Sequence, residues 1–406
     1  MTTADTAGFV IAGAGIGGLT AALALHARGI GATVLEAAEE ILPLGVGINI
    51  QPAAIAELTA LGFADALAAT GIATREHLYV DHRGTTLWTE PRGLAAGYGH
   101  PQYSLHRGEL QMMLLDAVRE RLGPGAVRTG LRVHGFERTA DGVRVEARDP
   151  SDSAVLLEAT ALIGADGVRS TVRDRLHPGR SGLSTGGTRM WRGLTELDGF
   201  LDGRTMIVAA DDRATRLIAY PVSTRAAARG KALLNWVCLV PDPAGGAAGD
   251  PRPSRPGDPE EVLPHLAHWS FDWLDLRAMV LGSPQILHYP MVDRDPLDRW
   301  GDGRVTLLGD AAHLMYPIGA NGASQAVLDA AALADHCAEH ADPAVALERY
   351  EAVRRPATTA IVLANREMDH AEKALAARPD GDKSATLAEV TTAYRTTVER
   401  RPSAGG

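Results

Sequence analysis

The sequence predicts an α/β protein in which a Rossmann-like dinucleotide-binding domain is interrupted by an antiparallel sheet and followed by a helical C-terminus. Three observations support this. The chain opens with a strand, a glycine-rich turn, a helix and a second strand. A block of β-rich stretches without convincing helices follows in the middle of the chain, and helical composition dominates from Ala320 to about Ala377. The sequence therefore predicts that the β-rich block interrupts the α/β domain, which resumes after it.

The opening unit carries a nucleotide-binding fingerprint. Residues 9–12 form an apolar run, 19–28 a helical stretch and 32–36 a second strand, and Gly13, Gly15 and Gly18 between them satisfy the GxGxxG spacing. Such a turn lets a helix N-terminus approach a pyrophosphate. Glu36 ends the second strand, where a carboxylate binds an adenosine ribose and repels a 2'-phosphate. We expect FAD or NAD rather than NADP here; the alternative is a glycine turn without a ligand.

Two later turns also combine aspartate with glycine. Residues 307–313 read Leu-Leu-Gly-Asp-Ala-Ala-His, and Asp310 at this strand end could accept hydrogen bonds from the ribityl hydroxyls of a flavin. Gly319 and Gly322 then begin a long helix whose free N–H groups can face the flavin pyrimidine edge. In residues 163–170, Asp166 could brace the first glycine turn and Arg169 could meet a phosphate. Taken singly, Asp310 could equally be a helix cap.

The middle block predicts strands over residues 188–197, 205–210, 215–222 and 232–240, with an exposed loop over 241–260. Trp191, Tyr220 and Trp236 could line a flat pocket for a planar aromatic substrate, although core packing explains each equally well. Arg192 could meet a substrate carboxylate or form a structural ion pair. His313 is interpreted as a structural histidine near the cofactor rather than a base.

Composition excludes several functions. The chain has 406 residues, a net charge of -10 and a pI near 5.8, which argues against nucleic acid as a partner. Its two cysteines, Cys238 and Cys337, suggest neither disulfide nor zinc, so we expect no metal and a reducing cytoplasm. Neither an export signal nor a membrane anchor is evident.

The three glycine-and-aspartate turns, in this order, resemble the dinucleotide fingerprint, the Asp-Gly motif and the Gly-Asp motif of the single-component class A flavoprotein aromatic hydroxylases. The resemblance covers nearly the whole chain. Residues 42–52, 101–111 and 289–296 are further similar to hydroxylases of phenazine-1-carboxylate and 5-methylphenazine-1-carboxylate.

This resemblance implies the fold of p-hydroxybenzoate hydroxylase. Residues 1–75, 101–180 and 290–360 are then the FAD-binding domain, 76–100 and 181–289 the substrate-binding sheet domain, and 361–406 a helical segment. FAD would be bound tightly, and NADH or NADPH and O2 would be transient co-substrates. A small planar aromatic acid would be the substrate, and the protein would be a monomer or homodimer.

The resemblance also assigns roles to individual residues. The turn glycines and Glu36 match the adenosine diphosphate site, and Leu131 a backbone contact near the adenine. The resemblance also places four features beside the flavin ring: a mobile loop, an arginine that reaches across the ring, a ligand of the ribityl chain and a segment beneath the ring. These positions are Gly45 and Gly47, Arg107, Asp310, and Pro317, Gly319, Asn321 and Gly322. The resemblance requires no catalytic side chain.

The reaction implied is the hydroxylation of an aromatic acid through a flavin C4a-hydroperoxide, with loss of CO2 where a phenazine-1-carboxylate becomes a 1-hydroxyphenazine. The alternatives are a salicylate- or hydroxybenzoate-type hydroxylase and a flavoprotein that only sequesters an aromatic antibiotic. A single GxGxxG argues against Baeyer–Villiger and N-hydroxylating enzymes. The spacing of Trp269 and Trp273 argues against a flavin halogenase.

Overall fold

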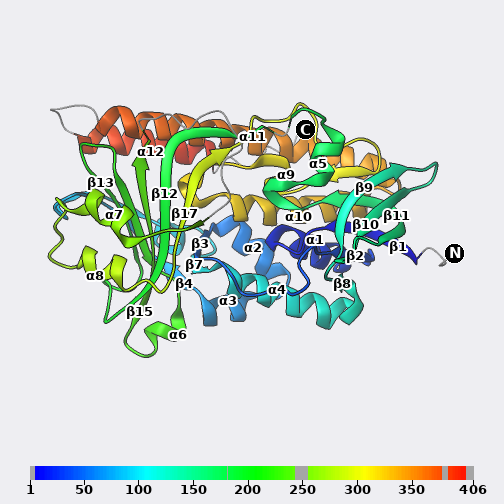
Figure 1. Ribbon diagram of the computed structural model, residues 1–406. Coiled ribbons are helices and arrows are strands. Elements are labelled where there is room, and N and C mark those ends of the chain that lie inside the picture. The colour runs from blue at the N-terminus through cyan, green and yellow to red at the C-terminus, as the bar shows by residue number, and fades with distance from the viewer. Residues whose placement is uncertain (1–4, 181, 243–254, 377–382, 399–406) are drawn as a thin grey trace.

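A computed structural model describes residues 5–180, 182–242, 255–376 and 383–398. The chain forms three sheets with helices packed around and between them, and one long C-terminal helix lies along one side of the molecule with a shorter helix beside it (Figure 1). The predicted α/β class with an inserted sheet and a helical C-terminus is confirmed.

The first sheet is the dinucleotide-binding body. Its strands β1 (Asp5–Ala12), β2 (Ala32–Leu35), β8 (Val127–Arg128), β11 (Ala154–Gly164) and β18 (Val305–Leu307) pair in parallel, and β9 (Arg132–Arg138) and β10 (Val143–Arg148) add an antiparallel edge. Helix α1 (Ile16–His26) is apolar almost throughout, because it is packed between α4 (Arg107–Leu122) and α10 (Gly322–Glu339). The carboxyl ends of β1, β11 and β18 therefore meet at one edge, where parallel α/β sheets bind ligands.

The second sheet has eight strands, and it includes the four stretches predicted from the middle of the sequence. These are β12 (Ser184–Leu197), β13 (Thr205–Ala210), β14 (Arg216–Pro221) and β15 (Ala232–Pro241). Strands β16 (Arg255–Pro256) and β17 (Ile286–Asp293) extend one edge, and β5 (Glu76–Asp81) and β6 (Thr86–Pro91) the other. All neighbours pair antiparallel except β13 and β5. Most of the predicted loop, residues 243–254, lies outside the described residues.

Two helices that the sequence did not predict, α7 (Pro259–Leu266) and α8 (Leu276–Leu281), lie against the outer face of this sheet (Figure 1). Apolar side chains of the sheet and of these helices form a separate core there. Because successive side chains of a strand point to opposite faces, the other face is left to line a cavity.

Smaller elements connect the two sheets. A three-stranded sheet of β3 (Gly47–Ile50), β7 (Gln102–His106) and β4 (Ile72–Thr74) lies between them, with α2 (Pro52–Ala60) and α3 (Ala64–Thr70) beside it. Short helices α5 (Thr171–Leu176), α6 (Thr224–Ala227) and α9 (Asp310–His313) and single turns η1 (Gly93–Ala96), η2 (Pro124–Ala126), η3 (Gly167–Arg169) and η4 (Ile318–Ala320) complete the chain.

The C-terminal helix α11 (Pro343–Ala376) passes over both sheets, and α12 (Lys383–Val398) packs against α11 and beside β6 of the eight-stranded sheet (Figure 1). Helix α11 runs unbroken through the domain boundary expected at 360/361, and its Asn365 and Arg366 bind Tyr316 and Asp293 of the preceding segments. The division of the chain into domains stays a prediction. No helix among the described residues is both long and apolar enough to cross a membrane.

Candidate active site

A cavity of about 1350 Å³ lies where the two sheets meet. It runs from the glycine turn at Gly15 past Asp310 and the segment Pro317–Gly322, which we call the flavin loop, to the inner face of the eight-stranded sheet. Residues of α11 and α12 close its remaining side. Such a space can take an elongated cofactor together with a planar substrate.

The glycine turn forms a cradle at one end of this cavity. Gly13 has a φ of +103°, and a β-carbon there would meet the carbonyl oxygen of Ala165 at 2.5 Å. A β-carbon at Gly18 would collide with the carbonyl oxygen of Gly13, whereas the same position at Gly15 is open and faces the cavity. The turn thus fits a pyrophosphate at the N-terminus of α1.

Glu36 holds this turn in place. Its carboxylate accepts hydrogen bonds from the backbone N–H groups of Ala14 and Ala38, both at 2.8 Å. The N–H of Leu131 donates to the carbonyl oxygen of Glu36 at 2.8 Å, so Leu131 lies beside the expected adenosine end. A carboxylate can accept more than two hydrogen bonds, which leaves Glu36 able to bind ribose hydroxyls as well.

Asp166 has a different role from the one expected. Its carboxylate caps α5 by accepting hydrogen bonds from the N–H of Thr171 at 2.7 Å and from the hydroxyl of Ser170. Burial raises the pKa of Asp166, and these hydrogen bonds oppose that rise. The Ala165–Asp166 backbone, rather than the carboxylate, contacts Gly13, and Arg169 is exposed and does not line the cavity. The expected brace therefore comes from the main chain.

Asp310 begins α9 and turns its carboxylate into the cavity. The surrounding protein raises its pKa by desolvation, while His313 and Arg107 act in the opposite direction. The β position of Gly322 is 3.9 Å from the Asp310 carboxylate, so the N-terminus of α10 lies next to it. The structure thus brings together Asp310, Arg107 and the flavin loop, as the FAD hypothesis requires.

The residues that hold Asp310 were missed by the sequence analysis. Asp329, on α10, accepts hydrogen bonds from the N–H of Gly309 at 3.1 Å, from His313 Nε2 at 2.6 Å and from Arg354 Nε at 2.8 Å. Burial alone would raise the pKa of Asp329, but His313 and Arg354 lower it. His313 is 4% exposed and does not line the cavity, which agrees with a structural histidine. Asp329 within the apolar run of residues 326–334 was the available signal.

Gly45 lies beside Arg107, and Gly47 contacts the inner face of the eight-stranded sheet. Gly45 has a φ of +120°, and a β-carbon there would be 3.4 Å from Arg107 Cβ and Cδ. The carbonyl oxygen of Gly47 accepts hydrogen bonds from Arg192 Nη2 at 2.7 Å and from the hydroxyl of Tyr220 at 3.0 Å. Two residues predicted to bind substrate therefore line the cavity and also fix this loop.

The expectation that Trp191 and Trp236 line the pocket was wrong. Both are buried in the core beneath α7 and α8 on the opposite face of the sheet. The indole of Trp191 donates to Glu261 at 3.0 Å, and that of Trp236 to Ser283 at 2.8 Å. Because Trp191 and Arg192 are neighbours in one strand, their side chains cannot share a face.

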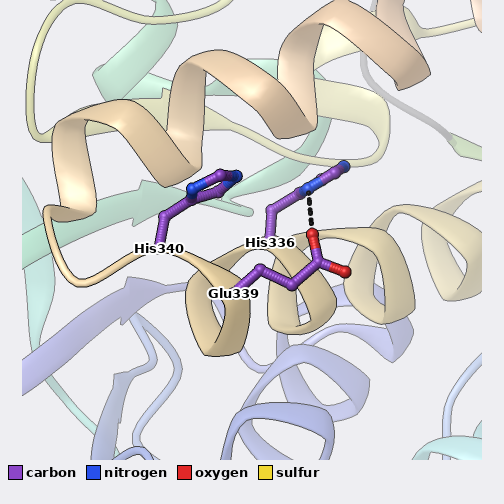
Figure 2. Close-up of side chains that lie close together, drawn as sticks. All are labelled: His336, Glu339 and His340. Carbon is purple, nitrogen blue, oxygen red and sulfur yellow. Dashed lines mark ion pairs between the residues drawn. The ribbon is translucent and has the colours of Figure 1, made fainter.

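A group of potential metal ligands lies outside the cavity. His336, Glu339 and His340 gather at the end of α10, where Nδ1 of His336 is 3.2 Å from the Glu339 carboxylate (Figure 2). None of the three lines the cavity. We assign no part of the site's chemistry to them.

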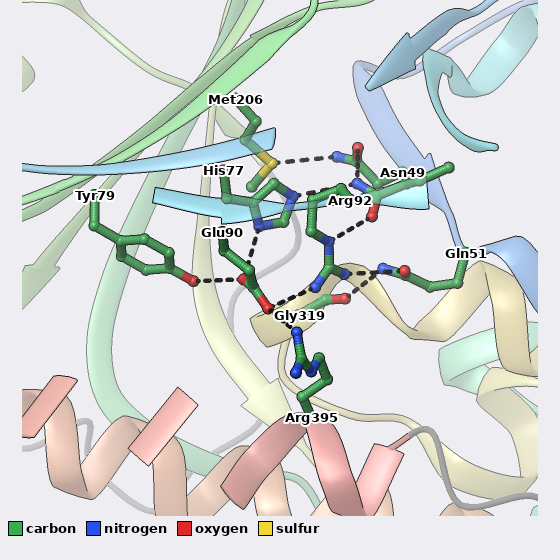
Figure 3. Close-up of polar contacts among 10 residues, drawn as sticks. Asn49, Gln51, His77, Tyr79, Glu90, Arg92, Met206, Gly319 and Arg395 are labelled. Atoms are coloured by element: carbon green, nitrogen blue, oxygen red, sulfur yellow. Dashed lines mark hydrogen bonds and ion pairs between the residues drawn. The ribbon is translucent and has the colours of Figure 1, made fainter. Parts of the chain in front are cut away.

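A buried polar cluster crosses the cavity wall between the eight-stranded sheet and the flavin loop (Figure 3). Glu90 is 1% exposed and binds Arg92 at 3.1 Å. Arg92 donates to Gln51 at 3.1 Å, and the Gln51 amide donates to the carbonyl oxygen of Gly319 at 3.0 Å. His77 packs beside Glu90, and burial lowers its pKa well below the usual value. These residues were not predicted, because they come from distant segments.

Comparison with known proteins places the chain in a family. A family model described as an FAD binding domain matches residues 6–216 and 278–365. The chain is 63% identical over 403 residues to phenazine 1,6-dicarboxylic acid hydroxylase PhzS of Lysobacter antibioticus, covering 98% of this chain and 99% of that protein. It is 31% identical over 359 residues to 3-hydroxybenzoate 6-hydroxylase 1 of Aquipseudomonas alcaligenes, covering 85% and 84%.

A solved structure supports the same assignment. The chain is similar to Klebsiella pneumoniae HpxO complexed with FAD and uric acid, with a TM-score of 0.75 and 28% identity over 97% of this chain and 93% of that one. The salicylate hydroxylase substrate complex, at 20% identity over 99% and 100% of the two chains and a TM-score of 0.73, shows the same fold. The p-hydroxybenzoate hydroxylase-like fold is thereby confirmed. This chain belongs to the family of class A flavoprotein aromatic hydroxylases, which are FAD-dependent monooxygenases that use NAD(P)H and O2.

Proposed function

We propose that this protein hydroxylates a phenazine carboxylate at the carbon that bears the carboxylate, releasing CO2 and giving a 1-hydroxyphenazine. Aromatic carboxylic acid, O2, NAD(P)H and a proton yield the hydroxylated ring, CO2, NAD(P)⁺ and water. The similarity to a phenazine dicarboxylate hydroxylase over nearly the full length of both chains supports a phenazine rather than a benzoate.

The observation that carries this proposal is a cation without an acidic partner in an otherwise apolar wall. Met190, Ile218, Val237 and Leu239 line the inner face of the sheet together with Arg192. No acidic side chain of the described residues pairs with Arg192; its Nη2 donates to the Gly47 carbonyl oxygen, and its Nε has no hydrogen-bond partner among those residues. Arg192 is half-buried and lines the cavity, so its remaining N–H groups are suited to bind a carboxylate.

Of the other arginines that line the cavity, all but Arg107 pair with acidic side chains, and Arg107 lies at the Asp310 end, where the flavin is expected. Arg216 pairs with Asp369 at 2.7 Å and also with Glu372, and Arg92 pairs with Glu90. A substrate carboxylate would therefore be directed to Arg192, and the ring would lie on the apolar side chains. The Gly47 carbonyl held by Arg192 connects this anchor to the loop beside Arg107.

The same proposal assigns residues to FAD. Glu36 and the glycine turn would hold the adenosine diphosphate, Asp310 the ribityl chain, and the N–H groups at the start of α10 the pyrimidine edge. When bound, FAD supplies hydride acceptance from the nicotinamide and electron transfer to O2. The protein's own residues orient the ring and exclude water. Monomeric or dimeric assembly, a cytoplasmic location and the absence of a nucleic-acid partner stay predictions.

Product analysis tests the substrate. Purified holoprotein with NADH or NADPH is supplied with phenazine-1-carboxylate, its 5-methyl derivative, phenazine-1,6-dicarboxylate, salicylate and 3-hydroxybenzoate. We expect hydroxyphenazines and CO2 by mass spectrometry. Products from the benzoates alone would favour the hydroxybenzoate-type alternative and refute the phenazine proposal. A phenazine that binds without accelerating NAD(P)H oxidation would favour the antibiotic-binding alternative.

Two substitutions on the same strand test the anchor. Arg192→Gln should raise the KM for the carboxylate substrate by about 10-fold or more, since a hydrogen bond to a charged group contributes about 1.5–3 kcal/mol. Arg189→Gln is the matched control, because Arg189 lies over the Trp191 ring on the other face. An equal effect of the two substitutions would reject Arg192 as the anchor.

A further inference from the structure

The C-terminal helix contacts the flavin loop directly. We infer that Tyr394, on α12, is a positioning residue that fixes the backbone of the flavin loop, so that the last helix of the chain is part of the active site. This inference rests on FAD binding by the family and does not depend on which aromatic acid is the substrate.

The flavin loop adopts a backbone that needs external support. Gly319 has a φ of +65° and Ala320 a φ of +55°, and the second of these is unfavourable for a residue with a β-carbon. Such conformations persist where the surroundings impose them. Asn321, the next residue, is 1% exposed, so its side chain is part of that surrounding structure.

The Tyr394 hydroxyl is the centre of the contacts that impose this backbone. It accepts a hydrogen bond from Asn321 Nδ2 at 2.7 Å, and it lies 3.0 Å from the carbonyl oxygen of Ile318 and 2.7 Å from Asn365 Oδ1, to one of which it donates. Asn365 in turn donates to the carbonyl oxygen of Tyr316 at 3.0 Å. Burial raises the pKa of Tyr394, so the hydroxyl keeps its proton.

The fit between Tyr394 and the loop is also steric. A β-carbon at Gly319 would collide with the Tyr394 hydroxyl, which therefore occupies the space that any other residue at 319 would need. The hydroxyl thus packs against the loop as well as binding it on both sides of Gly319.

The neighbouring residue reaches the same loop by a second route. Arg395 is 3.4 Å from Glu90, which binds Arg92, and Arg92 binds Gln51, whose amide holds the Gly319 carbonyl oxygen (Figure 3). Helix α12 is thus connected to Ile318 through Tyr394 and to Gly319 through Arg395. The two routes connect the loop to α12 and to strand β6 of the eight-stranded sheet.

The loop position matters because the N–H groups at the start of α10 are the donors that would meet the flavin pyrimidine edge. Preorganised donors stabilise charge only when they are held within tenths of an ångström of their place. Loss of the Tyr394 hydroxyl should therefore alter the flavin itself, whereas a purely structural tyrosine would alter only stability.

The test compares Tyr394→Phe with Thr396→Ala in the full chain. Thr396 lies on the same helix, is exposed, and among the described residues bonds only to Thr392 of its own helix. We expect Tyr394→Phe to speed hydrogen–deuterium exchange of residues 316–323 in the apoprotein by about 10-fold or more. In the holoprotein it should make the flavin midpoint potential more negative and at least double the fraction of NADH electrons released as peroxide. Thr396→Ala should change none of these.

Unchanged exchange and an unchanged potential in Tyr394→Phe would overturn the inference, as would a lower melting temperature with wild-type potential and peroxide release. Hydrogen–deuterium exchange and the flavin midpoint potential are measured without substrate, so both remain valid tests even if the phenazine proposal fails. Asn365→Ala is the second variant. Because Asn365 and Tyr394 act on one loop, the double variant should show less than the sum of the two single effects, and strict additivity would contradict a shared role.

Discussion

Two aspartates act at the turn after β18, Asp310 from within it and Asp329 from helix α10, and their surroundings give them different roles. Asp310 faces the cavity with few partners, whereas Asp329 is fully buried and binds Gly309, His313 and Arg354. The first is available to a ligand. Asp329 holds the turn in the conformation that directs the Asp310 carboxylate into the cavity.

Replacing Asp310 should weaken FAD binding. Asp310→Ala removes an acceptor for the ribityl hydroxyls, so the Kd for FAD should rise about 10- to 100-fold, as expected for hydrogen bonds to a charged group. Quenching of FAD fluorescence on titration of the apoprotein measures this. The exposed Asp298→Ala provides the control, and an unchanged Kd in Asp310→Ala would remove Asp310 from the cofactor site.

Replacing Asp329 should lower stability. Asp329→Asn keeps the shape but leaves Arg354 with its charge buried and unpaired, and breaking a buried pair costs about 3–5 kcal/mol. Urea unfolding of the apoprotein measures the change. The control on the same helix is Asp335→Asn, whose partner Arg28 is partly exposed, and which should cost no more than about 1 kcal/mol. Similar losses for both would show that the cluster is not a stabilising centre.

At the scale of elements, the alternation of side chains along β12, β14 and β15 decides which residues line the cavity. Tyr220 is paired with Asn235 across the strands and lines the cavity, and the Asn235 side chain on the same face accepts a hydrogen bond from the Gly47 N–H. Trp236 is paired with Gly193 and Ala219 and faces α7 and α8. The contact between Glu261 of α7 and Trp191 of this sheet depends on pH.

Glu261 of α7 should make the docking of this helix acid-sensitive. A hydrogen bond from Arg255, aided by the Trp191 indole and opposed by burial, lowers the pKa of Glu261 to about 2. A depressed carboxyl pKa contributes stability above the unfolded value, near 4.5, and that stability is lost as the pH falls towards 2. The melting temperature of wild type should therefore fall more steeply over this window than that of Glu261→Gln.

The neighbouring Glu260→Gln serves as the control for this measurement, because Glu260 is exposed and forms no side-chain ion pair among the described residues. Parallel pH profiles for wild type and Glu261→Gln would contradict a depressed pKa.

At the scale of the whole molecule, the cavity joins segments that are far apart in sequence. The glycine turn near residue 15, the sheet face near 190 and 220, the flavin loop near 320 and the end of α12 near 395 all line it. A ligand that touches the first three of these should stabilise the chain as a unit, because it binds the folded protein alone.

FAD should raise the melting temperature more than riboflavin does. At a concentration 100 times its Kd, a ligand of the native state adds about 2.7 kcal/mol. Riboflavin lacks the adenosine diphosphate that the glycine turn and Glu36 would hold, so at equal concentration its shift should be much smaller. Thermal unfolding of the apoprotein followed by circular dichroism checks this. Equal shifts for the two ligands would show that the glycine turn contributes little to binding.

The sequence by itself determined the local units of this protein. The glycine turn with Glu36, the strand before Asp310 and the four strands of the inserted sheet were all predicted, because each is specified by residues of one continuous stretch of sequence. The helices α7 and α8 were missed, since their short apolar patterns carry little information without the sheet they cover.

Only the tertiary structure decided which side of each strand became the substrate face and which distant residues support the cofactor site. A strand alternates between two faces, so the sequence requires Trp191 and Arg192 to point apart but does not say which one meets the cavity. That depends on where α7 and α8 pack. Asp329, Glu90 and Tyr394 act on turns tens to hundreds of residues away, and no local spacing records a contact that forms only when the chain folds back on itself.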